Sequence, residues 1–165
     1  MKLEGHGEHM EEEHVELLTK RGETVAVAES LTGGLVCAAI TSIPGASVVL
    51  QGGVVAYATE LKATLLDVSP ELLGERGPVD PDVAVAMAHG VRIRCGATYG
   101  LATTGVAGPD SQGGFPPGTV HVAVVSADDS EFVRTLHLSG DRAAVRATSV
   151  AAALELLMGA ADTCA

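Results

Sequence analysis

Three segments of the 165-residue chain carry side chains and backbone that could do chemistry. The first is Ala28-Glu-Ser-Leu-Thr-Gly-Gly34, in which Ser30 follows a short apolar run and precedes two glycines. Glycines let a ligand approach the backbone closely, and amides at a helix start stabilise an anion or a developing oxyanion. Ser30 is therefore either a nucleophile or a helix cap, and Thr32, Gly33 and Gly34 are candidate ligand contacts.

The second segment is Tyr57-Ala-Thr-Glu-Leu-Lys62, which places a lysine in the first turn of a predicted helix. The positive end of the helix dipole disfavours an ammonium group there, and burial would lower the pKa of Lys62 further. A neutral amine can deprotonate a serine hydroxyl, as in enzymes that pair serine with lysine. The alternative is an exposed surface lysine.

The third segment is Thr103-Thr-Gly-Val-Ala-Gly-Pro109, a glycine-rich stretch directly after a predicted strand. Its backbone amides can form an anion-binding concavity or an oxyanion hole, although a plain surface loop is an equal alternative. Arg142 and Arg146 begin the last predicted helix, where either can reach a phosphate or carboxylate or simply lie on a solvated face. The candidate contacts in the glycine-rich stretch are Thr104, Gly105, Ala107 and Gly108.

The elements that must position these segments alternate between strands and helices. Apolar periodicity predicts strands at 24–28, 53–57, 99–103, 119–125 and 131–138, and helices at 8–20, 35–40, 59–66, 81–95 and after 141. Residues 72–77 are a loop or a short turn of helix. Helices between the early strands favour parallel crossovers, and the last two strands form a hairpin. We expect an α/β fold with a mixed, mostly parallel sheet of about five strands and helices on both faces, with ligands bound beyond the carboxyl ends of the strands.

Composition excludes nucleic acid and membrane as partners. The chain has 21 acidic and 10 basic residues, a net charge of −11, two Tyr, two Phe and no Trp. Nucleic-acid binders usually present a basic face or aromatic stacking platforms, and both are missing here. Neither the apolar core of a signal peptide nor a run of 18 apolar residues is present, so we expect a soluble, cytoplasmic protein.

The cysteines and histidines indicate neither disulfides nor a metal site. Three cysteines without a Cys-x-x-Cys pair fit reduced thiols. His6, His9 and His14 lie in the acidic segment 1–14 without the spacing of a zinc site, so we expect no metal and no cofactor. We expect residues 1–14 to be a tail or the start of the first helix, and 15–160 to be one domain.

Five motifs in order resemble the CinA C-terminal domain family, the PncC-type nicotinamide mononucleotide deamidases. They are Ala28-Glu-Ser-Leu-Thr-Gly-Gly34, Gly52-Gly-Val-Val-Ala-Tyr57 with Lys62 after it, Thr104-Gly-Val-Ala-Gly-Pro109, Pro117-Gly-Thr-Val120 and Gly140-Asp-Arg142. The resemblance covers about Val15 to Met158, whereas many relatives also carry an N-terminal domain resembling molybdopterin-binding proteins. Five ordered motifs are far more specific than any one of them.

The resemblance implies a three-layer α/β/α sandwich that hydrolyses the carboxamide of nicotinamide mononucleotide to nicotinic acid mononucleotide and ammonia. It implies Ser30 as the nucleophile, Lys62 as its base and Tyr57 as a catalytic or positioning hydroxyl. It also assigns Thr104 and Gly105 to the substrate pocket and an arginine of 142–146 to a phosphate or substrate contact.

Departures from the family pattern bear on substrate recognition. Leu31 stands where many relatives have cysteine, a change that should be neutral if that side chain faces the core. Asp80 replaces a common serine, and the loop 110–116 lacks a basic residue often found there. Two other functions therefore stay open. One is a non-catalytic nucleotide- or phosphate-binding module, and the other is a structural or assembly role, since the chain is a possible homo-oligomer.

Overall fold

The computed structural model describes residues 6–165, with side chains described from residue 12 onward. The helices are α1 (His6–Arg21), α2 (Leu35–Thr41), α3 (Thr59–Leu66), α4 (Pro70–Arg76), α5 (Pro81–Cys95) and α6 (Arg142–Thr163), with a 3-10 turn at Ala46–Val48. The strands are β1 (Val25–Glu29), β2 (Leu50–Val55), β3 (Tyr99–Gly105), β4 (Thr119–Val125) and β5 (Glu131–His137).

The five strands form one sheet in the order β2-β1-β3-β4-β5. Strand β1 pairs in parallel with both β2 and β3, whereas β3–β4 and β4–β5 are antiparallel. The mixed five-stranded sheet is therefore confirmed, while the expectation of a mostly parallel sheet is only approximate. The reason is that a loop, rather than a crossover helix, joins β3 to β4, and a tight turn joins β4 to β5.

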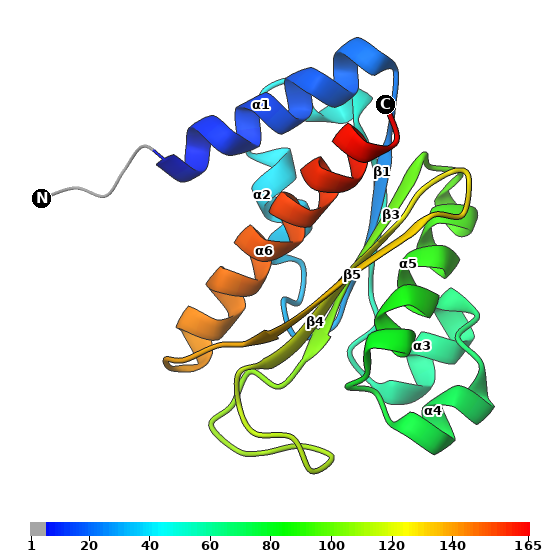
Figure 1. The fold of residues 1–165 in the computed structure, drawn as a ribbon, viewed down its shortest axis with the longest axis vertical. Coiled ribbons are helices and arrows are strands. Elements are labelled where there is room, and N and C mark those ends of the chain that lie inside the picture. Colours follow the sequence, from blue (N-terminus) through cyan, green and yellow to red (C-terminus); the bar gives the residue numbers. More distant parts are fainter. Residues whose placement is uncertain (1–5) are drawn as a thin grey trace, which may run out of the picture.

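Helices cover both faces of the sheet, as the sequence predicted (Figure 1). Helices α1, α2 and α6 lie on one face and α3, α4 and α5 on the other. Strand alternation sends Val25, Val27 and Leu101 into the first layer, and Ala26 and Ala28 into the second. The sheet thus has a face of large aliphatic side chains and a face of small ones.

The small face lets α5 approach the sheet closely. A Cβ atom at Gly100 would lie 1.8 Å from the carbonyl oxygen of Ala88, and one at Gly90 would lie 1.9 Å from that of Leu66. Glycine is therefore required at both positions by backbone contact. These contacts fix α5 against the start of β3 and the end of α3 against α5.

Helix α4 covers most of the segment 72–77, for which the sequence predicted a loop or a short turn of helix. Pro70 begins it, and the Ser69 side chain accepts a hydrogen bond from the Leu72 amide at 3.2 Å. Proline at the first helical position and serine before it are the usual start signals, which stabilise this short helix.

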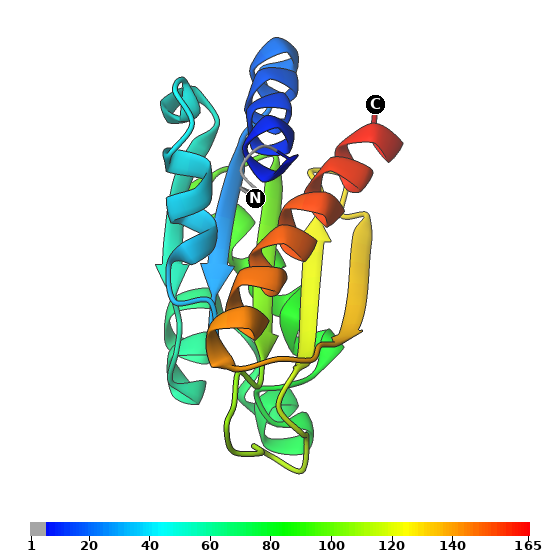
Figure 2. The same cartoon turned by 90° about the vertical axis from the view of Figure 1, so that its left-hand side faces the viewer.

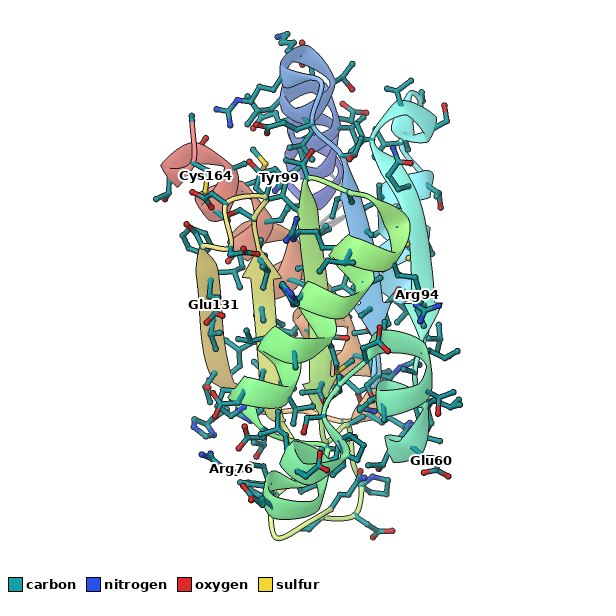
Figure 3. The ribbon with its side chains drawn as sticks, turned by 90° about the vertical axis from the view of Figure 1, so that its right-hand side faces the viewer. Glu60, Arg76, Arg94, Tyr99, Glu131 and Cys164 are labelled. Atoms are coloured by element: carbon teal, nitrogen blue, oxygen red, sulfur yellow. The ribbon has the colours of Figure 1, made fainter. Side chains whose placement is uncertain are left out.

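The carboxyl ends of β1 and β3 meet at one end of the sheet (Figure 2). The loop between β3 and β4, the start of α6 and the helices α3 and α4 gather at that same end. Figure 3 shows Tyr99, at the start of β3, at the opposite end from Glu60 in the first turn of α3. The three segments with candidate site residues therefore lie together at the end of the sheet where β1 and β3 terminate.

Helix α6 has the length and composition of a membrane span, with a hydropathy of 1.4 over its most apolar window. Of that window 44% is buried inside the fold, and Val145, Leu156 and Leu157 belong to the larger core cluster. A core helix satisfies the same criterion, and the buried side of α6 packs on β3 and β4.

Candidate active site

Ser30 and Lys62 are in direct contact at the carboxyl edge of the sheet. Ser30 follows the last residue of β1, and Lys62 lies in α3. The Lys62 amine nitrogen lies 3.1 Å from the Ser30 hydroxyl oxygen. Only 8% of Ser30 and 1% of Lys62 are exposed, so the pair is shielded from bulk water.

Burial sets the protonation of Lys62. Desolvation lowers the pKa of the amine from 10.5 to about 8, and the Glu60 carboxylate opposes the shift. The amine lies 2.7 Å from the carbonyl oxygen of Ala56 and 3.4 Å from that of Tyr57. A neutral amine can donate its two hydrogens to these carbonyls and turn its lone pair to the Ser30 hydroxyl. The contacts thus suit a general base.

The turn after Ser30 is fixed against β3. The Ser30 amide donates to the Thr103 carbonyl at 3.1 Å, and the Thr32 and Thr103 hydroxyls lie 2.8 Å apart. Gly33 and Gly34 have φ angles of 57° and 109°, in the left-handed region that favours glycine. The two glycines therefore serve the shape of the turn.

Glu29 occupies the start of α2. Its buried carboxylate accepts hydrogen bonds from the amides of Val36 at 2.9 Å and Cys37 at 3.1 Å. We expected the amides at this helix start to stabilise a substrate anion, and the structure corrects that expectation. These two amides already bind an internal carboxylate, which leaves the turn itself and the loop after β3 as sources of oxyanion donors.

Replacing Glu29 by glutamine is expected to destabilise the fold by about 2 kcal/mol. One of the two carboxylate oxygens becomes an amide nitrogen, which faces a buried backbone N–H without an acceptor. For a chain of this size the melting temperature should fall by roughly 4–8 °C. Thermal unfolding followed by circular dichroism measures this, with the exposed Glu60→Gln as control. An unchanged melting temperature would contradict the anchoring role of Glu29.

A cavity of about 370 Å³ opens beside the Ser30–Lys62 pair. The predicted site residues that line it are Ser30, Tyr57, Lys62, Thr104, Gly105, Ala107, Gly108 and Arg142. The other four lie outside its lining. Thr32 is buried against Thr103, Gly33 and Gly34 shape the turn, and Arg146 binds the backbone of that turn.

Arg142 links two walls of the cavity. Its guanidinium donates to the Gly108 carbonyl at 2.7 Å and to the Tyr57 hydroxyl at 3.0 Å. Tyr57 is 58% exposed, so its ring forms part of the cavity rim. No carboxylate pairs with Arg142 within the part of the chain that the structure describes, so its charge is available to an anion.

The glycine-rich loop is shaped by close backbone contacts. A Cβ at Gly105 would lie 2.6 Å from the Thr119 carbonyl oxygen, so β3 and β4 approach closely only because that side chain is absent. The Thr104 hydroxyl donates to the Pro78 carbonyl at 2.6 Å. Thr104 therefore ties the loop to the segment before α5.

Sequence reasoning missed part of the cavity wall. The unpredicted lining residues are Leu31, Pro78, Val79, Val106, Pro109, Asp110, Ser111 and Gln112. The sequence could have indicated Asp110–Gln112, because these residues directly continue the glycine-rich stretch that was predicted to bind an anion. Pro78 and Val79 precede the helix start at Asp80-Pro81, a signal that locates the helix but not a ligand.

No metal-binding group emerges from the described side chains, among which no three His, Cys, Asp or Glu residues cluster. The ring nitrogen of His14 lies 3.0 Å from the Leu154 carbonyl oxygen. The side chains of His6 and His9 lie outside the described part of the chain. The cysteines at positions 37, 95 and 164 are free thiols.

Fold and site together define an α/β/α sandwich protein with a buried serine–lysine pair beside a polar cavity. The chain belongs to the CinA C-terminal domain family, whose profile matches residues 7–161. The resemblance seen in the five motifs is therefore confirmed.

Individual relatives agree with this assignment. A CinA-like protein of Frankia casuarinae is 50% identical over 141 residues, which are 86% of this chain and 32% of that protein. The crystal structure of the competence/damage inducible protein CihA of Agrobacterium tumefaciens is 33% identical, with a TM-score of 0.90 and coverage of 96% of this chain and 98% of that chain. A CinA superfamily protein of Escherichia coli is 28% identical, with a TM-score of 0.89 over 96% and 92% of the two chains. The chain spans about a third of the length of the curated relatives it matches.

Proposed function

We propose that this chain is an amidohydrolase that converts nicotinamide mononucleotide to nicotinic acid mononucleotide and ammonia. The observation that carries the proposal is the 3.1 Å contact between the Lys62 amine and the Ser30 hydroxyl at a cavity wall. A serine becomes a nucleophile when a base takes its proton, and a buried amine with a pKa of about 8 can do so near neutral pH.

The reaction runs in two halves. Neutral Lys62 accepts the hydroxyl proton as the Ser30 oxygen bonds to the carboxamide carbon, and the carbonyl oxygen takes the negative charge. When the tetrahedral intermediate collapses, the carbon–nitrogen bond breaks and the Lys62 proton leaves with ammonia. Water, deprotonated in turn by Lys62, then attacks the acyl-serine ester. As the ester bond breaks, Lys62 returns the proton to the Ser30 oxygen and the acid is released. Backbone amides around the cavity hold the oxyanion in both halves.

Charges around the cavity fit a substrate with a positive ring and a phosphate. Asp110 places a carboxylate in the lining and Arg142 places a guanidinium there, with the catalytic pair beside them. Nicotinamide mononucleotide carries a pyridinium cation and a phosphate anion, which such groups complement. The volume of about 370 Å³ lies within the range of small-molecule sites.

Replacing Arg142 by alanine is expected to raise KM for nicotinamide mononucleotide by roughly tenfold to a hundredfold. The guanidinium provides a charge-assisted hydrogen bond to the phosphate, and also orients Tyr57. Steady-state kinetics measures this with nicotinamide mononucleotide and nicotinamide riboside, which lacks the phosphate. Equal losses on both compounds would contradict a phosphate contact.

The activity should rise with pH through an apparent pKa of about 8. Below that pH the folded protein holds Lys62 as an ammonium, which has no lone pair for the Ser30 proton. A profile of kcat/KM from pH 6 to 10 measures this rising limb of the activity. A flat profile through this range would contradict Lys62 as the base.

The competing function is a nucleotide-binding module without catalysis. Titration calorimetry and ammonia release, measured on the same preparation, separate the two. Binding with turnover supports the hydrolase, whereas binding without ammonia favours the module. In this proposal the binding partner is a small-molecule nucleotide, no cofactor takes part, and the enzyme acts in pyridine nucleotide salvage in the cytoplasm. Whether the chain forms a homo-oligomer is tested by light scattering.

A further inference from the structure

We propose that Arg146 is a positioning residue that holds the nucleophile turn in its reactive shape; this inference rests on the serine chemistry proposed above. Arg146 lies in the second turn of α6, and its guanidinium reaches back to the chain segment after Ser30. Its Nε donates to the Leu31 carbonyl at 3.0 Å, and a terminal nitrogen donates to the Thr32 carbonyl at 3.3 Å. Two consecutive carbonyls are thus bound by one planar group.

The clamp fixes the peptide planes that immediately follow the nucleophile. In a trans peptide the N–H points opposite to the carbonyl, so holding a carbonyl also directs the amide on its other side. The Gly33 amide, opposite the Thr32 carbonyl, donates to the Ser30 carbonyl at 3.1 Å. The Thr32 amide, opposite the Leu31 carbonyl, donates to no acceptor within the described residues. Arg146 therefore directs a donor two residues from the Ser30 oxygen.

Arg142 and Arg146 have different roles, which their spacing in the sequence did not distinguish. Arg142 lines the cavity and contacts its rim, whereas Arg146 lies behind the turn and outside the lining. A Cβ at Gly33 would lie only 3.5 Å from the Arg146 guanidinium, which shows how closely the arginine follows the turn. Loss of Arg142 should weaken substrate binding, and loss of Arg146 should slow the chemical step.

Within the turn, the Leu35 amide also donates to the Thr32 carbonyl at 3.0 Å, but among the described residues no backbone amide binds the Leu31 carbonyl, which Arg146 holds. Thr103 holds Ser30 and Thr32 from the side of the sheet, and Glu29 holds the start of α2 beyond the turn. Arg146 is the contact from α6. Small displacements of a nucleophile or an oxyanion donor cost about a hundredfold in rate, so one lost clamp has a measurable effect.

The test compares Arg146→Ala with wild type in kcat, KM and chemical rescue. We expect kcat to fall roughly tenfold to a hundredfold with KM nearly unchanged. Guanidinium chloride at millimolar, non-denaturing concentrations should restore part of kcat, because the ion can fill the vacated position. Arg134→Ala is the matched control. Arg134 lies in β5, and its guanidinium pairs on the surface with Glu155 of α6, the helix that carries Arg146, at 3.2 Å. Arg146→Lys, which keeps one donor, should be intermediate and decides the test if the alanine variant does not fold.

A second readout separates failure of this inference from failure of the proposed function. A fluorophosphonate reacts with an activated serine of any substrate specificity, forming an oxygen–phosphorus bond and releasing fluoride. Slower labelling of Ser30 in Arg146→Ala, rescued by guanidinium, supports the clamp even if wild type releases no ammonia. Unchanged kcat and labelling, or a loss confined to KM, would overturn it. If wild type shows neither labelling nor ammonia release, both proposals fail.

Discussion

Replacing Ser30 by alanine is expected to reduce ammonia release from nicotinamide mononucleotide by at least about a thousandfold. The reason is that no other hydroxyl in the cavity wall is in contact with the Lys62 amine within the described residues. Binding of the substrate should persist, because Arg142 and the loop after β3 are untouched.

The same variant decides whether Ser30 is only a helix cap. In that case the melting temperature would fall and activity would remain. The structure favours the opposite result, since α2 has no side-chain cap at Gly34 and Glu29 accepts hydrogen bonds from the amides of its second and third residues. Ser42→Ala, at the other end of α2, is the matched control for removal of a hydroxyl. Retained turnover in a folded Ser30→Ala protein would exclude the serine mechanism.

Replacing Lys62 by methionine is expected to lower kcat/KM by roughly a hundredfold to ten-thousandfold, the usual contribution of a general base. Methionine keeps much of the buried volume of Lys62 but offers no lone pair and no proton. The limb near pH 8 should disappear from the residual activity, because the group that titrates there is gone.

Circular dichroism must show that Lys62→Met is folded, and Lys20→Met supplies the control. Lys20 pairs with Glu16 at 2.9 Å on the surface of α1, so its loss removes a lysine far from the cavity. Full activity in Lys62→Met, or a residual profile that keeps the limb near pH 8, would eliminate the serine–lysine pair as the catalytic unit.

Local patterns in the sequence predicted the elements and the edge where the site lies. The strand before Ser30 and the helix that carries Lys62 both follow from short-range periodicity and start signals. The contact between the two side chains does not, because it depends on the parallel register that sets Glu29 beside Val55. The order of motifs in a known family, rather than spacing, supplied that pairing.

Other features depend on tertiary contacts that no local pattern records. Glu29 reads as one charged residue after an apolar run, and only the packing of α2 shows that it binds two amides. Arg142 and Arg146 share a spacing and a residue type, yet one faces the cavity and the other the back of the turn. The two arginines lie one turn apart on α6, and this difference in position decides which role each takes.

The most direct test of the account is ammonia release from nicotinamide mononucleotide by the purified wild-type protein, with and without a chelator. The serine–lysine mechanism predicts one ammonia for each nicotinic acid mononucleotide formed, at a rate that the chelator does not change. A folded protein that binds the nucleotide and releases no ammonia would contradict the account, as would activity that the chelator abolishes.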